Sequence, residues 1–178
     1  WNEIMKRWNN ENEMEMMRWE EKNDCSGIAH VVTLAWNEAY KDIVSRDFLD
    51  NLYVTEHDRA DEAYKKFNKR YNHQFVLDDN GEVVGFVNVG RAFDEEFDGY
   101  GEIFALYIIN GYKNKGYGEE LFKTGISELK DMGFDKVIVG CLENNPSNEF
   151  YKHLGGKFIK KRMFEKINIM ENVYEFDV

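Results

Sequence analysis

The segment Lys113-Asn114-Lys115-Gly116-Tyr117-Gly118 combines two glycines with two lysines, residue types that suit the binding of a phosphate group. It lies between an apolar, strand-like run from Ile103 to Ile109 and an amphipathic helical run from Leu121 to Leu129. Glycines let the backbone approach a ligand closely, and the first N–H groups of a helix have no partner inside the helix. The helix dipole adds partial positive charge at the same place. We therefore expect this turn to bind a ligand that carries a pyrophosphate.

The elements that position this turn follow from hydrophobic periodicity and turn residues. A strand over 102–109, the glycine turn, a helix to Met132 and a strand over 136–142 form a right-handed crossover unit, which predicts two parallel neighbouring strands. Asn80-Gly81 between apolar runs predicts a hairpin, so antiparallel pairs are expected elsewhere. The further elements we expect are strands at 14–19, 75–77, 83–89, 158–164 and 173–176, and helices at 24–39, 55–71 and 146–154. These elements predict a mixed α/β fold with a seven-stranded, mostly antiparallel sheet flanked by helices.

Two parts of the chain are expected to differ in organisation. Residues 14–178 read as one domain, because they contain no repeat, low-complexity segment or proline-rich linker. Residues 1–13 read as an N-terminal extension. Trp1, Ile4, Met5 and Trp8 follow helical spacing there, so we interpret the extension as a short helix or a cloning remnant.

Composition restricts the classes of partner. The formal net charge of −11 opposes binding to a nucleic-acid backbone, and no apolar run approaches the ~20 residues that a membrane-spanning helix needs. Cys25 and Cys141 form neither a disulfide framework nor a metal-site spacing, so we expect no metal, a buried reduced thiol at Cys141 and a cytoplasmic location.

Two motifs resemble the signatures of the Gcn5-related N-acetyltransferase (GNAT) superfamily. Lys113-x-x-Gly116-x-Gly118 is similar to its acetyl-CoA signature, Q/R-x-x-G-x-G/A, with lysine in place of glutamine or arginine. Asn144-x-x-Ser147-x-x-Phe150-Tyr151-x-x-x-Gly155-Gly156 is similar to its second signature, with serine in place of alanine. One helix and one strand separate the motifs, as in the family, and the resemblance extends over 14–178. It implies a GNAT-like sheet whose parallel strand pair lies at an acetyl-CoA site.

The resemblance also implies how acetyl-CoA binds as a co-substrate, without a metal. Lys113 keeps a cation near the pyrophosphate, although lysine lacks the fork geometry of arginine. Asn144 contacts the pantetheine arm or an ordered water, or is simply a turn asparagine. The remaining cofactor residues are Leu106, Tyr107 and Ile108, which lie along the pantetheine arm, and Lys115, Gly116, Tyr117, Gly118 and Glu119, which bind the pyrophosphate mainly through backbone amides.

Acetyl transfer to an amine needs a proton acceptor for the amine and a proton donor for the departing thiolate. Glu102 opens an otherwise apolar strand, where partial burial would raise its pKa, so it is the candidate base; the alternative is a solvated strand-entry residue. Tyr151 is the candidate acid, because the resemblance implies that a tyrosine at this motif position faces the thioester sulfur. Its alternative is an aromatic side chain packed in the core.

The acceptor is the least defined partner. The resemblance implies that Trp36, Tyr40 and Phe48 line its pocket, but aromatics at such positions are also common in cores. The acidic loop 94–98 would attract a cation, or is simply solvated. We expect transfer to a primary amine of a small molecule or peptide. A non-catalytic acyl-CoA-binding or sensor domain, an N-acyltransferase with another acyl-CoA, and a homodimer stay open.

Overall fold

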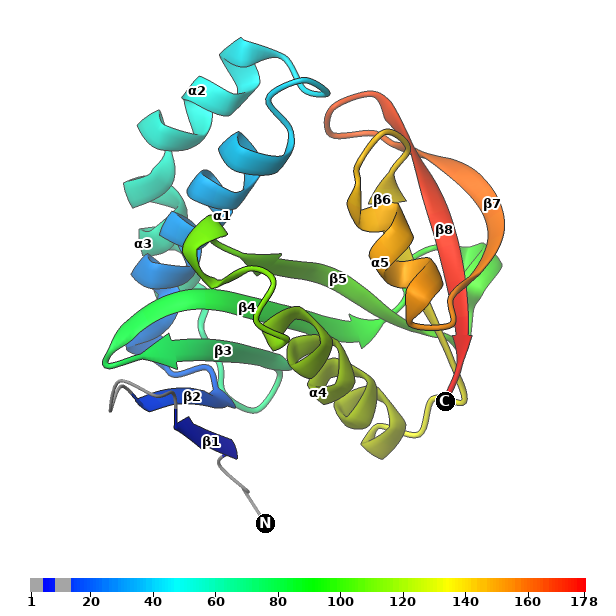
Figure 1. Ribbon diagram of the computed structural model, residues 1–178, viewed down its shortest axis with the longest axis horizontal. Coiled ribbons are helices and arrows are strands. Elements are labelled where there is room, and N and C mark those ends of the chain that lie inside the picture. The colour runs from blue at the N-terminus through cyan, green and yellow to red at the C-terminus, as the bar shows by residue number, and fades with distance from the viewer. Residues whose placement is uncertain (1–4, 9–13) are drawn as a thin grey trace.

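The part of the chain that the structure describes folds into one sheet with helices on both faces (Figure 1). The structure is a computed structural model, and it describes residues 5–8 and 14–178. Its strands are β1 (Met5–Trp8), β2 (Met14–Trp19), β3 (Gln74–Asp79), β4 (Glu82–Arg91), β5 (Gly101–Ile108), β6 (Lys136–Leu142), β7 (Lys157–Phe164) and β8 (Ile169–Asp177). Its α-helices are α1 (Cys25–Ala39), α2 (Arg46–Val54), α3 (Glu56–Lys66), α4 (Tyr117–Asp131) and α5 (Ser147–His153).

The strand order is β1-β2-β3-β4-β5-β6-β8-β7, and only β5 and β6 are parallel among the described strands. This order confirms the mixed, mostly antiparallel sheet and its parallel pair, but the described sheet has eight strands, because β1 adds one to the seven expected. Residues 5–8 correct the expected N-terminal helix, because they form strand β1 antiparallel to β2. A short isolated helix is marginal in water, whereas pairing along β2 satisfies backbone groups at the sheet edge. The other residues of that expectation, 1–4 and 9–13, lie outside the described residues, and the domain boundary at 13/14 stays a prediction.

The pairing between the parallel strands β5 and β6 is short, and this leaves the rest of the two strands free to diverge. Strands β5 and β6 pair only at Gly101–Val137, Glu102–Ile138 and Ile103–Val139. Beyond these residues β5 remains paired with β4, and β6 remains paired with β8. A register shift in the β4–β5 pairing leaves Phe104 without a partner, which marks a bulge where the pairing with β6 ends. The two strands therefore separate towards their C-terminal ends.

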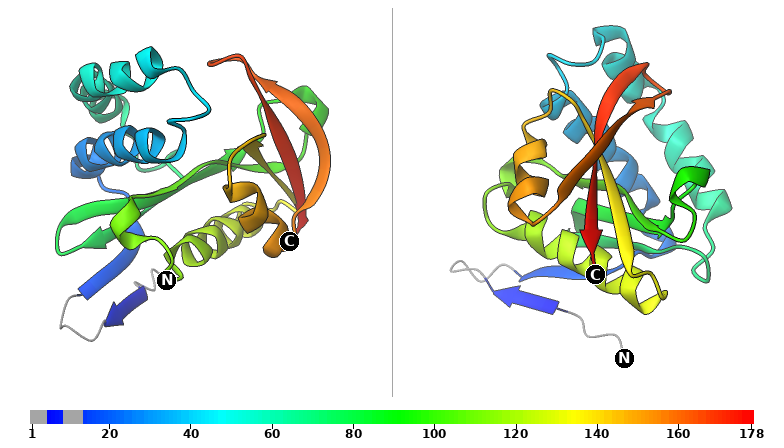
Figure 2. Two further views of the ribbon diagram at one scale, coloured as in Figure 1. Left: turned by 45° about the horizontal axis from the view of Figure 1, so that its top comes forward. Right: turned by 90° about the vertical axis from the view of Figure 1, so that its right-hand side faces the viewer.

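Helices cover the two faces of the sheet with apolar side chains (Figure 2). On one face, α4 buries Leu121 and Leu129 completely within the largest apolar cluster, which also holds Val87 from β4. On the opposite face, α1 packs Val31 against Val76 and neighbouring strand residues. Burial of such apolar side chains makes the main favourable contribution to the free energy of packing a helix onto a sheet.

The helices beside α1 depart from the sequence interpretation. Helix α2 was not predicted, although Ser45 supplies a recognisable N-cap: its Oγ accepts a hydrogen bond from the Phe48 backbone N–H at 3.3 Å. Helix α3 ends at Lys66, so the expected continuation to Tyr71 is wrong. Thr55 lies at the N-cap of α3, but its hydroxyl donates to the Asn51 carbonyl at 2.8 Å instead of capping α3.

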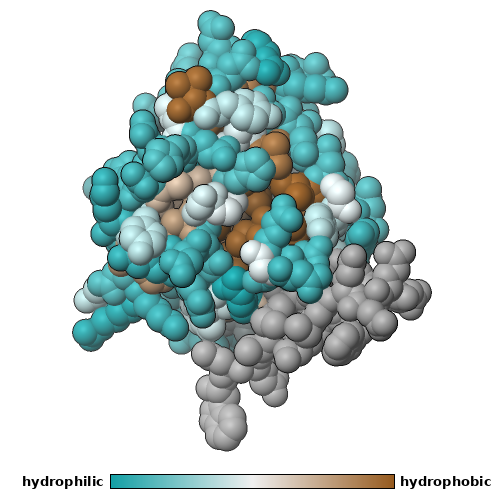
Figure 3. All heavy atoms as spheres, turned by 90° about the vertical axis from the view of Figure 1, so that its left-hand side faces the viewer, coloured by the Kyte–Doolittle hydropathy of each residue, from teal (hydrophilic) through white to brown (hydrophobic). Residues whose placement is uncertain are grey.

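Polar side chains dominate one face of the molecule (Figure 3). Figure 3 shows one face, on which hydrophilic residues surround a small hollow where a few hydrophobic side chains gather. None of the helices in the described ranges has both the length and the apolar character needed to cross a membrane.

Candidate active site

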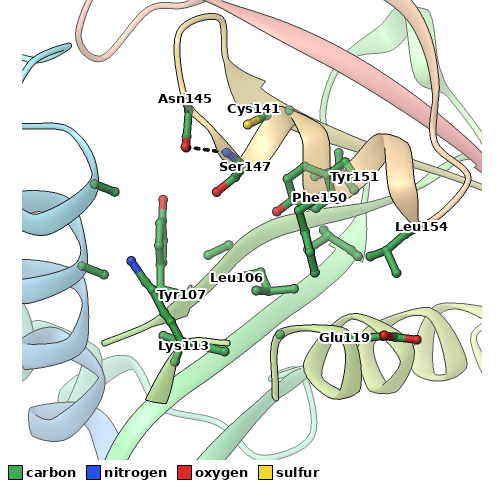
Figure 4. A pocket seen from close by; sticks show the side chains of 18 of the residues that line it. Leu106, Tyr107, Lys113, Glu119, Cys141, Asn145, Ser147, Phe150, Tyr151 and Leu154 are labelled. Carbon is green, nitrogen blue, oxygen red and sulfur yellow. Dashed lines mark hydrogen bonds between the residues drawn. The ribbon is translucent and has the colours of Figure 1, made fainter. Parts of the chain in front are cut away.

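A cavity of about 400 Å³ occupies the space where β5 and β6 separate (Figure 4). Its walls come from α1, from β5 and β6, from the turn before α4, and from α5. The cavity therefore joins the predicted phosphate turn to the predicted catalytic helix. Its size suits a small molecule or one arm of a larger cofactor.

The glycine turn closes one end of the cavity. Gly116 is the N-cap of α4 and has φ of 90°, a conformation that favours glycine. Gly118 also lines the cavity, and a Cβ there would lie 3.5 Å from the Phe150 ring, so any longer side chain would extend into the open space. The N-terminus of a 15-residue helix thus faces a concave site, an arrangement that favours anions.

Four of the six residues predicted at the pyrophosphate line this end of the cavity: Lys113, Gly116, Gly118 and Glu119. The other two do not. Lys115 places its Nζ 5.3 Å from the centre of the Tyr112 ring, and Tyr117 is buried in the core under α4. The carboxylate of Glu119 is paired with Lys123 Nζ at 2.6 Å, and this pair lowers the Glu119 pKa.

Strand β5 forms the second wall. Leu106, Tyr107 and Ile108 all line the cavity, as predicted for the cofactor arm. They belong to the part of β5 that has no partner in β6, so the edge of β5 that faces the cavity is available to an extended ligand.

Tyr151 projects from α5 into the cavity (Figure 4). Its ring packs 5.2 Å from the ring of Phe150 and 6.2 Å from that of Tyr174, and the residue is 7% exposed. Burial raises the pKa of Tyr151 well above its ordinary value, with smaller contributions from Cys141 and Tyr107. The phenol therefore keeps its proton near neutral pH and can donate a hydrogen bond.

Of the two asparagines in the turn after β6, Asn145 lines the cavity and the predicted Asn144 does not. Asn144 is exposed and does not line the cavity, whereas its neighbour Asn145 is buried and does. Asn145 donates from Nδ2 to Tyr40 Oη at 3.4 Å and accepts at Oδ1 from the Ser147 backbone N–H at 2.9 Å. Motif alignment alone could not distinguish them, because burial depends on how the turn packs against α1.

The predicted acceptor aromatics form one cluster next to the cavity. The Trp36 ring lies 4.8 Å from Tyr40 and 5.6 Å from Phe48. Only Tyr40 of these three lines the cavity, and burial raises its pKa, with a further contribution from Tyr107. Trp36 and Phe48 support it from behind, against Phe164 from β7 and other apolar residues.

Glu102 lies behind the cavity wall. It is 6% exposed, and its Oε1 accepts a hydrogen bond from Arg162 Nη2 at 2.6 Å. Arg162 Nε donates in turn to Glu171 Oε1 at 2.5 Å. Burial raises the pKa of Glu102, while Arg162 opposes that rise. Sequence reasoning missed Arg162 and Glu171, because nothing local in β7 or β8 indicates a contact with β5.

The remaining candidate groups are the acidic loop 94–98 and the side-chain types that could bind a metal. In the acidic loop, Glu96 pairs with Lys160 Nζ at 2.5 Å and Asp98 with Arg91 Nη2 at 3.1 Å, so part of its charge is neutralised. Within the described ranges, no three histidine, cysteine or acidic side chains converge to hold a metal ion.

A parallel strand pair that separates over a cavity, with a helix N-terminus at one end, defines the class of CoA-dependent acyltransferases that the two motifs resemble. Comparison with known proteins identifies the family. Residues 36–155 match the model of the Acetyltransferase (GNAT) family. The chain belongs to this family and is an N-acetyltransferase.

Individual relatives agree with this assignment. The curated Bacillus subtilis protein YuaI, an uncharacterized N-acetyltransferase, is 30% identical over 149 residues, which cover 80% of each chain. PaiA N-acetyltransferase from Thermoplasma acidophilum, solved in complex with coenzyme A, has a TM-score of 0.69 at 14% identity, covering 92% of this chain and 99% of that one. The ribosomal-protein-S18-alanine N-acetyltransferase of Escherichia coli has a TM-score of 0.64 at 15% identity, covering 93% and 94%. Likeness at this level of identity concerns the fold alone.

Proposed function

We propose that this acetyltransferase uses acetyl-CoA and transfers the acetyl group directly to a primary amine of a small molecule or peptide. The observation that carries the proposal is the single cavity that joins the α4 N-terminus to Tyr151 along the separated strands. The PaiA relative contains coenzyme A, and YncA from Salmonella typhimurium, a putative acetyltransferase, was solved with its cofactor acetyl-CoA.

The residues present fit this cofactor. The backbone around Gly116 and Gly118, together with the Lys113 side chain, would hold the pyrophosphate, and Leu106 to Ile108 would hold the pantetheine arm. When bound, acetyl-CoA supplies an activated acetyl group as a thioester. The protein contributes orientation, exclusion of water and proton transfer.

Two residues carry the proton transfers in this proposal. Glu102 accepts a proton from the amine through an intervening water, because it lies behind the cavity wall, and its raised pKa suits a base that works near neutral pH. Tyr151 donates a hydrogen bond, and finally its proton, to the sulfur of the departing thiolate. Tyr151 is suited to this role because its hydroxyl faces the cavity and stays protonated.

Direct transfer is favoured because the available thiol is poorly nucleophilic. Cys141 lines the cavity, but burial raises its pKa to about 12, and nearby Glu171 adds to the effect. A thiol with such a pKa carries very little thiolate at neutral pH. Both Cys25 and Cys141 are free and buried, which suits the cytoplasmic location that we propose.

The test is a panel of primary amines, amino acids and peptides with acetyl-CoA, with release of free thiol as the readout. We expect amine-dependent thiol release, and a fall of about 10²-fold or more in kcat for Glu102→Gln. Binding of coenzyme A without thiol release for any amine would instead favour the non-catalytic acyl-CoA-binding alternative. Release with a longer acyl-CoA in preference to acetyl-CoA would favour the other N-acyltransferase.

A further inference from the structure

A buried set of charges spans four strands on one face of the sheet, and we call Glu102, Arg162 and Glu171 the carboxylate–arginine triad. Arg162 on β7 contacts Glu171 on β8 at 2.5 Å and reaches Glu102 on β5 at 2.6 Å. Strand β6 lies between β5 and β8 in the sheet, so these side chains must cross over it. With both carboxylates ionised, one guanidinium between them leaves a net charge of −1.

Gly140 is the residue of β6 that makes this crossing feasible. A Cβ at Gly140 would lie 2.6 Å from both Cδ and Oε1 of Glu171, well inside contact distance. The carboxylate of Glu171 therefore occupies the volume that a side chain at position 140 would need. Gly140 lines the cavity and Glu171 itself does not, so the carboxylate lies directly behind the cavity wall, at the point where Gly140 has no side chain.

Glu171 has hydrogen-bonding capacity to spare. Arg162 uses its Oε1, and in the described part of the chain no hydrogen bond to its Oε2 is found. The Glu171 side chain is 9% exposed. A hydrogen bond between a carboxylate and a charged donor is stronger than one between neutral groups, so a cationic N–H donor at this mostly buried side chain would be favourable.

The electrostatic surroundings of Glu171 favour a cation. Its charge reaches the cavity, because it raises the pKa values of Cys141 and Tyr107, two lining residues. Asp94 and Glu102 add negative charge on the same side, and Asp94 contributes to the raised pKa of Glu102. The cation facing the triad from β7 is Arg162, which the two carboxylates share.

We propose that Glu171 is a substrate-binding residue whose Oε2 binds the acceptor amine in its ammonium form, and that Arg162 is a positioning residue that holds Glu171 against Gly140. The inference rests on the proposed function, since the bound cation is the acceptor of that reaction. In this proposal the two carboxylates have different roles: Glu171 selects a cationic amine, and Glu102 accepts the proton of that amine.

The test compares wild type with Glu171→Gln, using 1,4-diaminobutane as the amine and saturating acetyl-CoA. Loss of a charge-assisted hydrogen bond should raise KM for the diamine about 10-fold or more, with kcat within about 3-fold. Affinity for coenzyme A should stay unchanged. Glu175→Gln is the matched control, because Glu175 lies four residues along β8 and pairs with Lys136 away from the cavity; it should leave KM unchanged.

A binding measurement keeps the inference independent of turnover. Calorimetry of 1,4-diaminobutane against the protein–coenzyme A complex should show binding for wild type and a loss of about 10-fold or more for Glu171→Gln. If wild type binds the diamine but transfers no acetyl group, the proposed function fails and this inference stands. Equal diamine affinity in wild type and folded Glu171→Gln, or no diamine binding to wild type, overturns the inference.

Folding of the variants is checked by circular dichroism. Glu171→Gln leaves Arg162 paired with Glu102, so we expect it to fold. Glu171→Asp keeps the charge and should restore part of the diamine affinity. An aspartate variant as weak as the glutamine variant, with both folded, would mean that charge at this position does not select the amine.

Discussion

Burial gives individual side chains in this site their chemical character. Tyr151, Cys141 and Glu102 each have a pKa shifted upward, and burial is the first cause in every case. The same effect has different consequences for each group. It keeps the tyrosine a proton donor, suppresses the thiolate, and makes the carboxylate a stronger base.

At this scale we expect Tyr151→Phe to lower kcat by about 10²-fold, because the thiolate would leave without a positioned proton donor. Affinity for coenzyme A should change little, since the ring still fills its place beside Phe150 and Tyr174. Steady-state kinetics and calorimetry measure the two quantities. Tyr64→Phe, on the exposed outer side of α3, is the matched control. Wild-type turnover in Tyr151→Phe would assign the donor role to another group.

Residues that a local pattern identifies do line the cavity. Gly116 and Gly118 lie in one turn and Tyr151 lies in a contiguous motif, and the roles assigned to all three stay predictions. Arg162 and Glu171 could not be predicted, because the contacts of Arg162 with both carboxylates depend on strand order and on the missing side chain at Gly140.

Among the elements, the N-terminus of α4 has the most clearly defined proposed role, which is to bind the pyrophosphate of coenzyme A. Gly118→Val should reduce coenzyme A affinity by 10-fold or more, because the side chain would extend into the cavity that the cofactor needs. The protein itself tolerates a Cβ there, at 3.5 Å from Phe150, so folding should survive. Gly111→Val is the control, since a Cβ at Gly111 meets open space and Gly111 does not line the cavity. Unchanged calorimetric affinity in a folded Gly118→Val protein would remove the turn from the site.

The junction between β2 and α1 contains another buried acid, Glu20, which does not line the cavity. Burial raises the pKa of Glu20 from 4.5 to about 7, and its partners are the Cys25 thiol at 3.7 Å and the Asn72 amide. Between pH 4.5 and 7 the folded protein retains a proton on Glu20 that the unfolded chain has released. The free energy of unfolding should therefore fall as pH rises through this window.

Glu20→Gln should remove that fall, because glutamine does not titrate. Relative to wild type, the variant should gain roughly 1 to 3 kcal/mol between pH 5 and pH 8. Urea unfolding at the two pH values measures the difference. Glu82→Gln, an exposed acid at the start of β4, should leave the pH dependence as it is in wild type. A parallel pH dependence in wild type and Glu20→Gln would show that Glu20 is not the group responsible.

Element prediction followed the strength of the local signals. The Asn80-Gly81 hairpin and the crossover into α4 were confirmed, because positive φ at Asn80 and Gly81 and a helix of 15 residues have strong sequence signatures. Helix α2 was missed because it has only nine residues and lies between two predicted helices. Strand β1 was missed because its partner strand, not its own pattern, determines its conformation.

For the whole molecule, the net charge of −11 should act on the rate of encounter. We expect kcat/KM for 1,4-diaminobutane to fall as salt rises from about 20 to about 500 mM, because salt screens the long-range attraction. Glutamate used as the acceptor should show a flat or rising dependence. No salt dependence for the diamine would mean that the acidic surface does not guide the substrate.

The three-residue contact between β5 and β6 has a mechanical consequence. It divides the sheet into β1–β5 and β6–β8, and the ladder that joins these two blocks is only three residue pairs long. A cofactor lying in the gap would contact both blocks. Separating the blocks would then also break these contacts, so the free energy of separation would increase by the free energy of cofactor binding. Amide hydrogen exchange should therefore slow on addition of coenzyme A at 104–108 and 139–142, while exchange in β2 and β3 stays the same. In this protein the co-substrate would be part of what keeps the two halves of the sheet together.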